Sequence, residues 1–281
     1  MEIYIPTRGR VFQETWSSLP KEIQEKVKLV IPWDSDCVRQ SGQVLRTPPE
    51  IDGIGPTRQW IIERVNYGRY DKPTKVVMLD DDLVFATRRE DEPTKFRNST
   101  PEDITILFSD IEHYLDNFAH VGVTTREGGN RDTAHTVVNT RLLRILAYRA
   151  DVLRDRNIRF DRMELMEDFD VTLQLLEQGY PNVKINWIVH NQRSSNAPGG
   201  CSTYRTIEKQ GEAANRLEQL HPQFVAVVEK QTKTAWNGKA RKDVRISWKN
   251  AIDSAPAIAV LDNGTEPGHA QEGPGATEAV E

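Results

Sequence analysis

Three successive carboxylates follow a short apolar run in the N-terminal half of the chain. Residues 76–79 are Val-Val-Met-Leu, and Asp80, Asp81 and Asp82 come directly after them. An uninterrupted apolar run is typical of a strand buried on both faces. Side chains alternate along a strand, which predicts that Asp80 and Asp82 face one way and Asp81 the other. A divalent cation would relieve the repulsion between two such carboxylates, although aspartates also open ordinary loops.

A second acidic pair lies at the head of a strongly amphipathic segment. Residues 165–178 carry apolar side chains at helical spacing, and Glu167 and Asp168 fall in the first turn. Carboxylates at a helix N-terminus are stabilised by the helix dipole, so both could be structural caps. The alternative is a general base that takes the proton from a hydroxyl group.

Two arginine-bearing motifs could bind a phosphate or a nucleotide. Residues 6–10, Pro-Thr-Arg-Gly-Arg, follow the first expected strand, where ligands bind in open α/β sheets. Residues 55–58, Gly-Pro-Thr-Arg, place Arg58 in the first turn of an expected helix. A cation is not stabilised at that end of the dipole, which indicates an anionic partner. The alternative is that these arginines are merely exposed.

The chain from residue 190 to residue 205 holds further candidates. An expected strand over residues 183–189 is followed by His190, and a neutral imidazole is a good ligand for a metal such as Mn2+. The loop after it is rich in small hydroxyl residues and glycines and ends at Arg205, as expected of a segment that wraps a diphosphate. A structural histidine and a plain connection are the alternatives.

The elements that must position these residues alternate between strand and helix. Such alternation predicts an α/β fold with a mixed, mainly parallel sheet flanked by helices. Periodicity and breakers predict strands at 3–5, 27–31, 44–46, 76–79, 121–123, 144–149 and 183–189. The same signals predict helices at 12–27, 56–67, 101–117, 151–156 and 165–178.

Composition narrows the class of protein. The 281 residues are 37% hydrophobic, the mean hydropathy is −0.61, and no window resembles a membrane span. The N-terminus has no signal-peptide pattern, and the two cysteines, Cys37 and Cys201, form neither a disulfide framework nor a zinc motif. These features predict a cytoplasmic protein with no membrane partner.

Charge is unevenly distributed along the chain. Residues 251–281 contain six acids and no Lys or Arg, so the formal net charge of −5 becomes +1 for residues 1–250. We expect residues 1–250 to form one domain, with 206–250 as a basic extension and 251–281 as an acidic, disordered tail. Cations and tryptophans alternate near the end of the extension, and Trp236, Lys239, Arg241, Lys242 and Arg245 are the candidates for a nucleic-acid contact. An ordinary solvated surface is an equal alternative, because the overall charge does not favour nucleic acid.

Together, these motifs resemble a known family. The order of strand-Pro-Thr-Arg, Gly-x-x-x-Arg helix, apolar strand ending in three aspartates, Glu-Asp helix and late histidine is similar to GT-A glycosyltransferases over residues 1–205. More narrowly, residues 5–10, 79–82, 166–168 and 194–196 resemble the TET-associated glycosyltransferases of phages. That family is thought to glycosylate hydroxymethylated pyrimidines in DNA, which would place this chain in the cytoplasm of a phage-infected host.

The resemblance implies a role for each motif. Asp80, Asp82 and His190 would hold Mn2+ or Mg2+, and Asp168 or Glu167 would deprotonate the acceptor hydroxyl. The donor would be a UDP-sugar and the acceptor duplex DNA with a hydroxymethylated pyrimidine such as 5-hydroxymethylcytosine. The donor-binding set would be Pro6, Thr7, Arg8, Arg10, Arg58, Asp80, Asp81, Ser194, Ser195, Asn196 and Arg205.

Other functions stay open at this point. A glycosyltransferase with a protein, lipid or polysaccharide acceptor would use the same donor site. A sugar-phosphate nucleotidyltransferase would also need paired acids and a metal, and a DNA-binding module would explain only the basic segment. The chain has no Gly-x-Gly-x-x-Gly or Walker motif, which disfavours a dinucleotide enzyme or P-loop ATPase.

Overall fold

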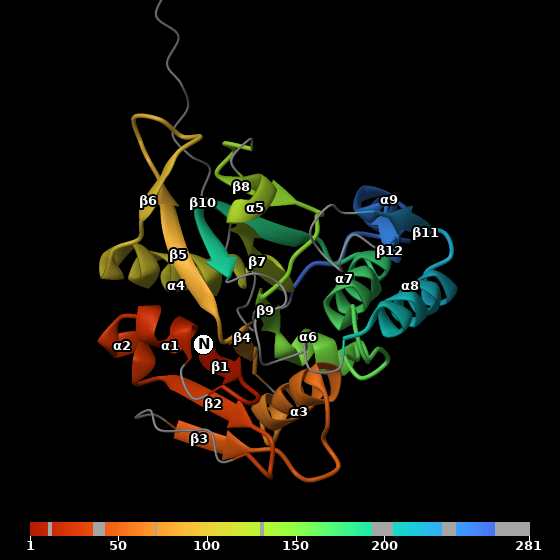
Figure 1. The fold of residues 1–281 in the computed structure, drawn as a ribbon, viewed down its shortest axis with the longest axis horizontal. Helices are drawn as coiled ribbons and strands as arrows, with labels where there is room; N and C mark the ends of the chain where they lie inside the picture. The colour runs from red at the N-terminus through yellow and green to blue at the C-terminus, as the bar shows by residue number, and fades with distance from the viewer. Residues whose placement is uncertain are drawn as a thin grey trace, which may run out of the picture.

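The fold is a large mixed sheet covered by helices on both faces (Figure 1). It is seen in a computed structural model that describes residues 1–10, 13–35, 43–70, 72–129, 132–192, 205–231 and 240–261. Within these ranges the main sheet has ten strands in the order β3-β2-β1-β4-β9-β7-β10-β5-β6, with β8 paired to β10. The strands are β1 (Glu2–Pro6), β2 (Val27–Ile31), β3 (Gln43–Arg46), β4 (Lys75–Leu79), β5 (Leu83–Arg88), β6 (Phe96–Asn98), β7 (His120–Thr125), β8 (Thr136–Val138), β9 (Ile145–Arg149) and β10 (Asn182–Gln192).

Parallel pairing dominates the side of the sheet that begins the chain. Strand β1 pairs in parallel with β2 and β4, and β2 pairs in parallel with β3. Strand β9 runs antiparallel to both of its neighbours, β4 and β7, and β5 and β6 add antiparallel pairing at the far edge. The predicted α/β class, a mixed sheet flanked by helices as in GT-A-like folds, is confirmed.

Strand alternation divides the apolar core between the two faces of the sheet. Ile3, Ile5 and Val77 belong to one core cluster, and Tyr4 and Met78 to the other. The first cluster packs beneath α1, α2 and α4, and the second beneath α3, α6 and α7. The helices are α1 (Glu14–Ser18), α2 (Lys21–Gln24), α3 (Ile54–Asn66), α4 (Pro101–Tyr114), α5 (Arg126–Gly129), α6 (Ala150–Asp155), α7 (Glu167–Glu177), α8 (Ile207–Leu220) and α9 (Trp248–Asp253).

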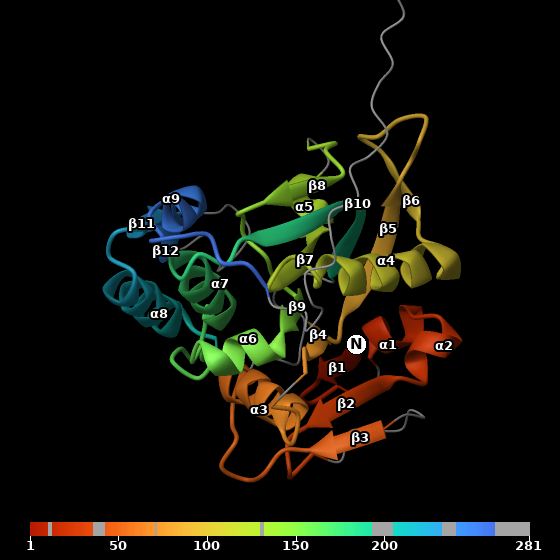
Figure 2. The ribbon, with the colours of Figure 1, turned by 180° about the vertical axis from the view of Figure 1, so that it is seen from behind.

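A third core cluster joins the end of the described chain to the main body. Helices α8 and α9 and the two-stranded sheet β11 (Val225–Lys230) and β12 (Arg241–Ile246) pack around α7, at one side of the molecule (Figure 2). Leu173 of α7, Leu217 of α8 and Ile252 of α9 are all buried in this cluster. The C-terminal extension therefore packs against α7, the helix whose first turn carries the predicted general base.

Several predicted boundaries were wrong for identifiable reasons. The helix expected over 12–27 is two short helices, because Pro20 interrupts it. The strand expected from 144 begins at Ile145, and strand β10 continues past His190 to Gln192. Strands β5, β6 and β8 were not predicted. Strands β6 and β8 have three residues each and carry little periodic signal, whereas β5 has six residues and lies between β10 and β6.

The tail was placed too early. Ala251 and Ile252 are buried in α9, and Ala259 donates a backbone hydrogen bond of 2.8 Å to Gly179. These small and isolated apolar residues form no pattern in the sequence, so the chain was not expected to pack there. Residues 262–281 lie outside the described residues.

Candidate active site

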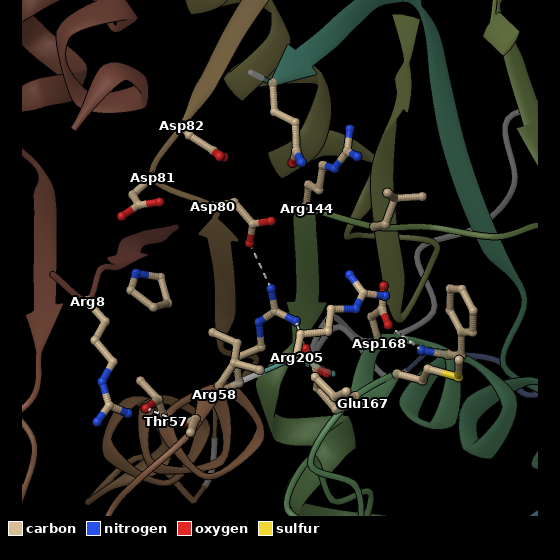
Figure 3. A pocket seen from close by; sticks show the side chains of 18 of the residues that line it. Arg8, Thr57, Arg58, Asp80, Asp81, Asp82, Arg144, Glu167, Asp168 and Arg205 are labelled. Atoms are coloured by element: carbon tan, nitrogen blue, oxygen red, sulfur yellow. Dashed lines mark hydrogen bonds and ion pairs between the residues drawn. The ribbon is translucent and has the colours of Figure 1, made fainter. Parts of the chain in front are cut away.

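A cavity of about 570 Å3 opens where the parallel strands β1, β2 and β4 end. Ligand sites of open α/β sheets lie at this edge. Figure 3 shows Asp80, Asp81 and Asp82, here called the acidic triad, on one side of the cavity and Glu167 and Asp168 on the other. The predicted site residues that line it are Pro6, Thr7, Arg8, Arg10, Arg58, Asp80, Asp81, Asp82, Glu167, Asp168, Arg205 and Arg241.

Helix α1 fixes the backbone of the acidic triad. Strand β4 ends at Leu79, and the buried side chain of Thr15 then bridges the turn to β5. Its hydroxyl donates to the carbonyl of Asp80 at 2.5 Å and accepts from the amide of Leu83 at 2.7 Å. The amide of Thr15 also donates to the carbonyl of Asp81 at 3.2 Å. Sequence reasoning missed Thr15, because nothing in its spacing marks a contact 65 residues away.

The motif after β1 neutralises two carboxylates of the triad. Thr7 donates its hydroxyl proton to Asp81 at 2.5 Å, and Arg10 forms ion pairs with Asp81 and with Asp82, the latter at 3.0 Å. Arg8 instead pairs with Asp52 at the mouth of the cavity. Burial raises the pKa of Asp81, while Thr7 and Arg10 act in the opposite direction.

Arg58 links the third member of the triad to the opposite wall. Its guanidinium is 4% exposed; it donates to Asp80 at 2.9 Å and to Glu167. A side chain at Gly55 would meet the carbonyls of Phe160 and Met163, so the close packing of α3 that brings Arg58 here requires glycine. Arg58 therefore has the anionic partner that was predicted, and this partner is a pair of carboxylates of the protein itself.

The two carboxyl partners of Arg58 titrate well above their usual range. Burial raises the pKa of Asp80 to about 6, with Arg58 opposing the shift and Asp82 and Asp81 adding to it. Burial likewise raises the pKa of Glu167 to about 7, against the attraction of Arg58. Perturbed groups of this kind cluster at functional sites.

A strained residue sets the direction of the first turn of α7. Met166, at the N-cap, has φ of 63°, a left-handed conformation that is uncommon for a bulky side chain. Glu167 then turns inward to Arg58, whereas Asp168 stays partly exposed in the cavity wall. Asp168 accepts a hydrogen bond of 3.0 Å from the amide of Phe169 and forms no ion pair with any described residue.

Comparison with known proteins gives this cavity its context. Residues 1–200 match the model of the family described as TET-Associated Glycosyltransferase. The chain belongs to this family. It is 25% identical over 203 residues, 67% of each chain, to the beta-glucosyl-HMC-alpha-glucosyl-transferase of Enterobacteria phage T2. It is also 25% identical over 204 residues, 68% of each chain, to the protein of the same name from Enterobacteria phage T6. The resemblance stated from the motifs is thus confirmed, and the chain is a glycosyltransferase.

The transferase buries His190 away from the cavity. His190 is fully buried in β10, opposite Phe85 of β5 and Thr125 of β7, and does not line the cavity. Burial, with the nearby charge of Arg144, lowers the pKa of its imidazole to about 3. Among the described residues no set of three or more His, Cys, Asp or Glu side chains is arranged to hold a metal ion. The metal-binding role of His190 stays a prediction.

The predicted DNA-contacting residues fall partly within the described ranges. Arg241 lines the cavity and pairs with Asp243 at 3.2 Å, while Lys242 and Arg245 are exposed on β12. In the described ranges of the transferase, no helix is long and apolar enough to cross a bilayer. Five predicted residues lie outside the described residues: Ser194, Ser195, Asn196, Trp236 and Lys239.

Two arginines that line the cavity were missed at the sequence level. Arg141 and Arg144 line the cavity from the segment that precedes β9. Arg141 lies over the ring of Phe169, with its guanidinium carbon 4.4 Å from the ring centroid. Isolated arginines in a loop carry no periodic signal, and only the fold shows that this segment runs beside the acidic triad.

Proposed function

We propose that this transferase moves a glycosyl group from a nucleotide-sugar to a hydroxyl group on a hydroxymethylated pyrimidine of phage DNA, in the cytoplasm of the infected cell. The observation that carries the proposal is a single cavity that combines an acidic triad, several arginines and one carboxylate free of ion pairs among the described residues. The acceptor is proposed from the relatives in phages T2 and T6, whose name, beta-glucosyl-HMC-alpha-glucosyl-transferase, refers to glucosylated HMC.

The donor is proposed to be a UDP-sugar bound across the strand ends. Pro6, Thr7 and Arg8 lie where β1 ends, beside Ile31 of β2, and would receive the nucleoside. Arg10 and Arg58 already have carboxylate partners, so in the donor site they hold the acidic triad in place. Ser194, Ser195 and Asn196 are proposed to close on the donor from the chain that follows β10.

The acidic triad has the chemistry of a divalent cation site. Asp80 lines the cavity, and burial raises its pKa, with repulsion from its neighbours Asp82 and Asp81 adding to the shift. A cation would relieve that repulsion, so Asp80 and Asp82 fit as ligands for Mn2+ or Mg2+. When bound, the ion would supply charge neutralisation for the leaving diphosphate. His190 would need a rearrangement of β10 to join them.

Asp168 is proposed as the general base. Its carboxylate faces the cavity without an ion pair among the described residues, whereas Glu167 is held by Arg58. Asp168 would accept the proton of the acceptor hydroxyl as that oxygen forms its bond to the anomeric carbon of the donor sugar. The bond from that carbon to the diphosphate oxygen breaks with its electron pair going to the diphosphate.

The acceptor DNA is proposed to approach over β12. The exposed cations Lys242 and Arg245 lie on this strand, and Arg241 of the same strand reaches the cavity wall. Lys239 and Trp236 come just before it in the chain and would extend the contact to the phosphate backbone and bases. Affinity for duplex DNA should then fall steeply with salt.

The test is a substrate screen with a defined readout. The protein is incubated with each of several nucleotide-sugars, Mn2+, and duplex DNA that contains cytosine, hydroxymethylcytosine or glucosylated hydroxymethylcytosine. Mass spectrometry of the released nucleosides should show one added sugar on a modified base and none on cytosine. Sugar addition only to the glucosylated base would make the glucose hydroxyl the acceptor, as the names of the relatives suggest. No sugar addition to any DNA, with release of pyrophosphate from a nucleoside triphosphate and a sugar phosphate, would replace the proposal with nucleotidyl transfer.

A further inference from the structure

The charges that line the cavity are unequally paired. Four groups of ion pairs are present: Arg8 with Asp52, Arg10 with two members of the acidic triad, Arg58 with Asp80 and Glu167, and Lys230 and Arg241 with Asp243. These leave Arg141, Arg144 and Arg205 without a carboxylate partner among the described residues, against the single unpaired carboxylate of Asp168. The unpaired groups therefore leave an excess of positive charge in the cavity.

Arg144 is held in place by its backbone. Its φ of 66° lies in the left-handed region, and its carbonyl accepts a hydrogen bond of 2.9 Å from the amide of Asp80. A left-handed arginine costs free energy that the surrounding structure must offset. The result is that the guanidinium of Arg144 is close enough to Asp80 and Asp82 for their charges to act on it, and in the view of Figure 3 Arg144 lies to the right of the acidic triad and above Asp168.

Stability alone does not explain this placement. The side chain of Arg144 is half-buried, and burial lowers the pKa of its guanidinium despite the attraction of Asp80 and Asp82. No described carboxylate lies within ion-pair distance of Arg144, in contrast to Arg10 and Arg58 on the same cavity. A half-buried cation without a partner is costly, so the cavity is better matched to a ligand that brings negative charge.

We infer that Arg144, with Arg141 beside it, forms a phosphate-binding site that holds the diphosphate of the donor during transfer. The inference rests on the proposed function for the identity of the diphosphate. A guanidinium presents a planar fork of donors that matches two phosphate oxygens at once. As the bond between the anomeric carbon and the diphosphate oxygen breaks, the electron pair moves to that oxygen, and Arg144 would stabilise the charge that develops there.

The same chemistry could come from the phosphate backbone of DNA. The geometry favours the donor, because Arg144 is fixed to the backbone of the acidic triad inside the cavity. A DNA backbone contact would instead be expected at exposed cations such as Lys242 and Arg245 on β12. The two sources predict different losses when Arg144 is replaced.

The experiment measures binding of inorganic pyrophosphate by calorimetry, without sugar or DNA, in wild type, Arg144→Met and Arg144→Lys. Charge-assisted hydrogen bonds predict affinity about 10- to 100-fold weaker for Arg144→Met and an intermediate loss for Arg144→Lys, which keeps the charge but not the fork. The matched control is Arg89→Met, since Arg89 is exposed outside the cavity and pairs with Asp91. This control should bind pyrophosphate as wild type does.

A parallel titration with duplex DNA separates the two sources of phosphate. Arg144→Met should bind DNA normally; a variant that loses DNA affinity and keeps pyrophosphate affinity overturns the inference, as does unchanged binding of both. If Arg144→Met does not fold, as judged by its thermal transition, Arg144→Lys decides the matter by the same criteria. Weakened pyrophosphate binding in a protein that glycosylates no DNA would leave the phosphate site standing and remove the proposed acceptor.

Discussion

The charged residues that line the cavity fall into two groups, called here the paired wall and the open wall. The groups are defined by ion pairing and not by side of the cavity, so Glu167 and Asp168, which lie on the same side, belong to different groups. The paired wall consists of Arg10, Arg58, the acidic triad and Glu167, and every charged group in it has a partner within the protein. The open wall consists of Arg141, Arg144, Arg205 and Asp168, which form no ion pairs among the described residues. The two groups meet in the chain at Glu167 and Asp168, which are adjacent residues.

The difference indicates a division of labour. Paired charges with low exposure hold each other in fixed positions before any ligand arrives, which is the arrangement expected of a preorganised site. Unpaired groups in a cavity retain their binding capacity for substrate. The adjacent residues Glu167 and Asp168 illustrate both cases, since one is an ion-pair partner and the other is free to accept a proton.

The strongest test of the open wall is Asp168→Asn. The amide keeps the shape of the side chain but cannot accept the proton of the acceptor hydroxyl, so turnover should fall by about 10²- to 10⁴-fold. Donor affinity should change little, because no cation of the cavity depends on Asp168 for an ion pair. Single-turnover rates and calorimetry with the UDP-sugar measure the two quantities.

Asp161→Asn is the matched control for this change. Asp161 is a surface carboxylate that pairs with Arg159, outside the cavity. Its variant should retain wild-type turnover. Near-normal turnover in Asp168→Asn would show that the base is elsewhere, and a similar loss in both variants would mean that the effect is structural.

The strongest test of the paired wall is Arg58→Met. Removing this guanidinium leaves Asp80 and Glu167 without their shared cation, and breaking a buried ion pair in this way typically costs about 3–5 kcal/mol. Arg144→Met, in the open wall, should destabilise the fold far less because no described carboxylate loses a partner. Denaturant unfolding of the two variants compares the walls directly, and equal losses would contradict the distinction between them.

The cost of Arg58→Met should also depend on pH. The folded pKa values of Asp80 and Glu167, about 6 and about 7, lie above their ordinary values. At pH values between the ordinary and the folded pKa of each group, the folded state therefore binds more protons than the unfolded chain. Stability therefore falls as pH rises through this range. Without Arg58 both carboxyl groups hold their protons to still higher pH, so the destabilisation should be larger at pH 8 than at pH 5.5. A cost that is the same at both values would show that Arg58 does not control these groups.

Asp82→Ala tests the proposed cation site. Replacing a residue that hydrogen-bonds to a metal ligand typically weakens metal affinity by about 10- to 100-fold. Replacing the ligand itself should weaken metal affinity by at least as much. Binding of the UDP-sugar in the presence of Mn2+ should weaken accordingly, and binding without Mn2+ should not. Calorimetry with and without the ion measures both, and unchanged Mn2+-dependent affinity would reject Asp82 as a ligand.

The sequence predicted the paired wall better than the open one. Apolar runs that stop at Pro6 and before Asp80 identify the carboxyl ends of strands, which meet at one edge of a parallel sheet. Helical periodicity from residue 165 identifies the helix that begins with Glu167. Arg144 could not be found in this way, because its role depends on a left-handed backbone and on a hydrogen bond to residue 80. The position of His190 was predicted wrongly for a different reason. It was expected just after a strand, but strand β10 continues beyond the point where the apolar pattern stops and includes His190.

A smaller effect is expected along α7, the helix whose first turn carries Asp168 of the open wall. His221, 2% exposed, contacts Asp170 at 2.8 Å through Nε2 and Glu177 at 2.5 Å through Nδ1, and Arg162 also reaches Asp170 at 3.2 Å. Burial lowers the pKa of His221, but its two carboxylate partners outweigh that effect and leave the pKa raised.

A histidine with a raised folded pKa stabilises the protein fully below its ordinary value of 6.5, and that contribution is lost as pH rises through the folded value. Wild type should therefore lose part of its stability between pH 6 and pH 9, and His221→Gln, which cannot take up the proton, should lose less over the same interval. Free energies of unfolding at the two values measure the difference. Because His221 connects α8 to α7, the protection factors of the α8 amides, from which the intrinsic acceleration of exchange with pH is removed, should fall in wild type at the higher pH. Parallel pH profiles for the two proteins would show that the stability of this contact is independent of the imidazole charge.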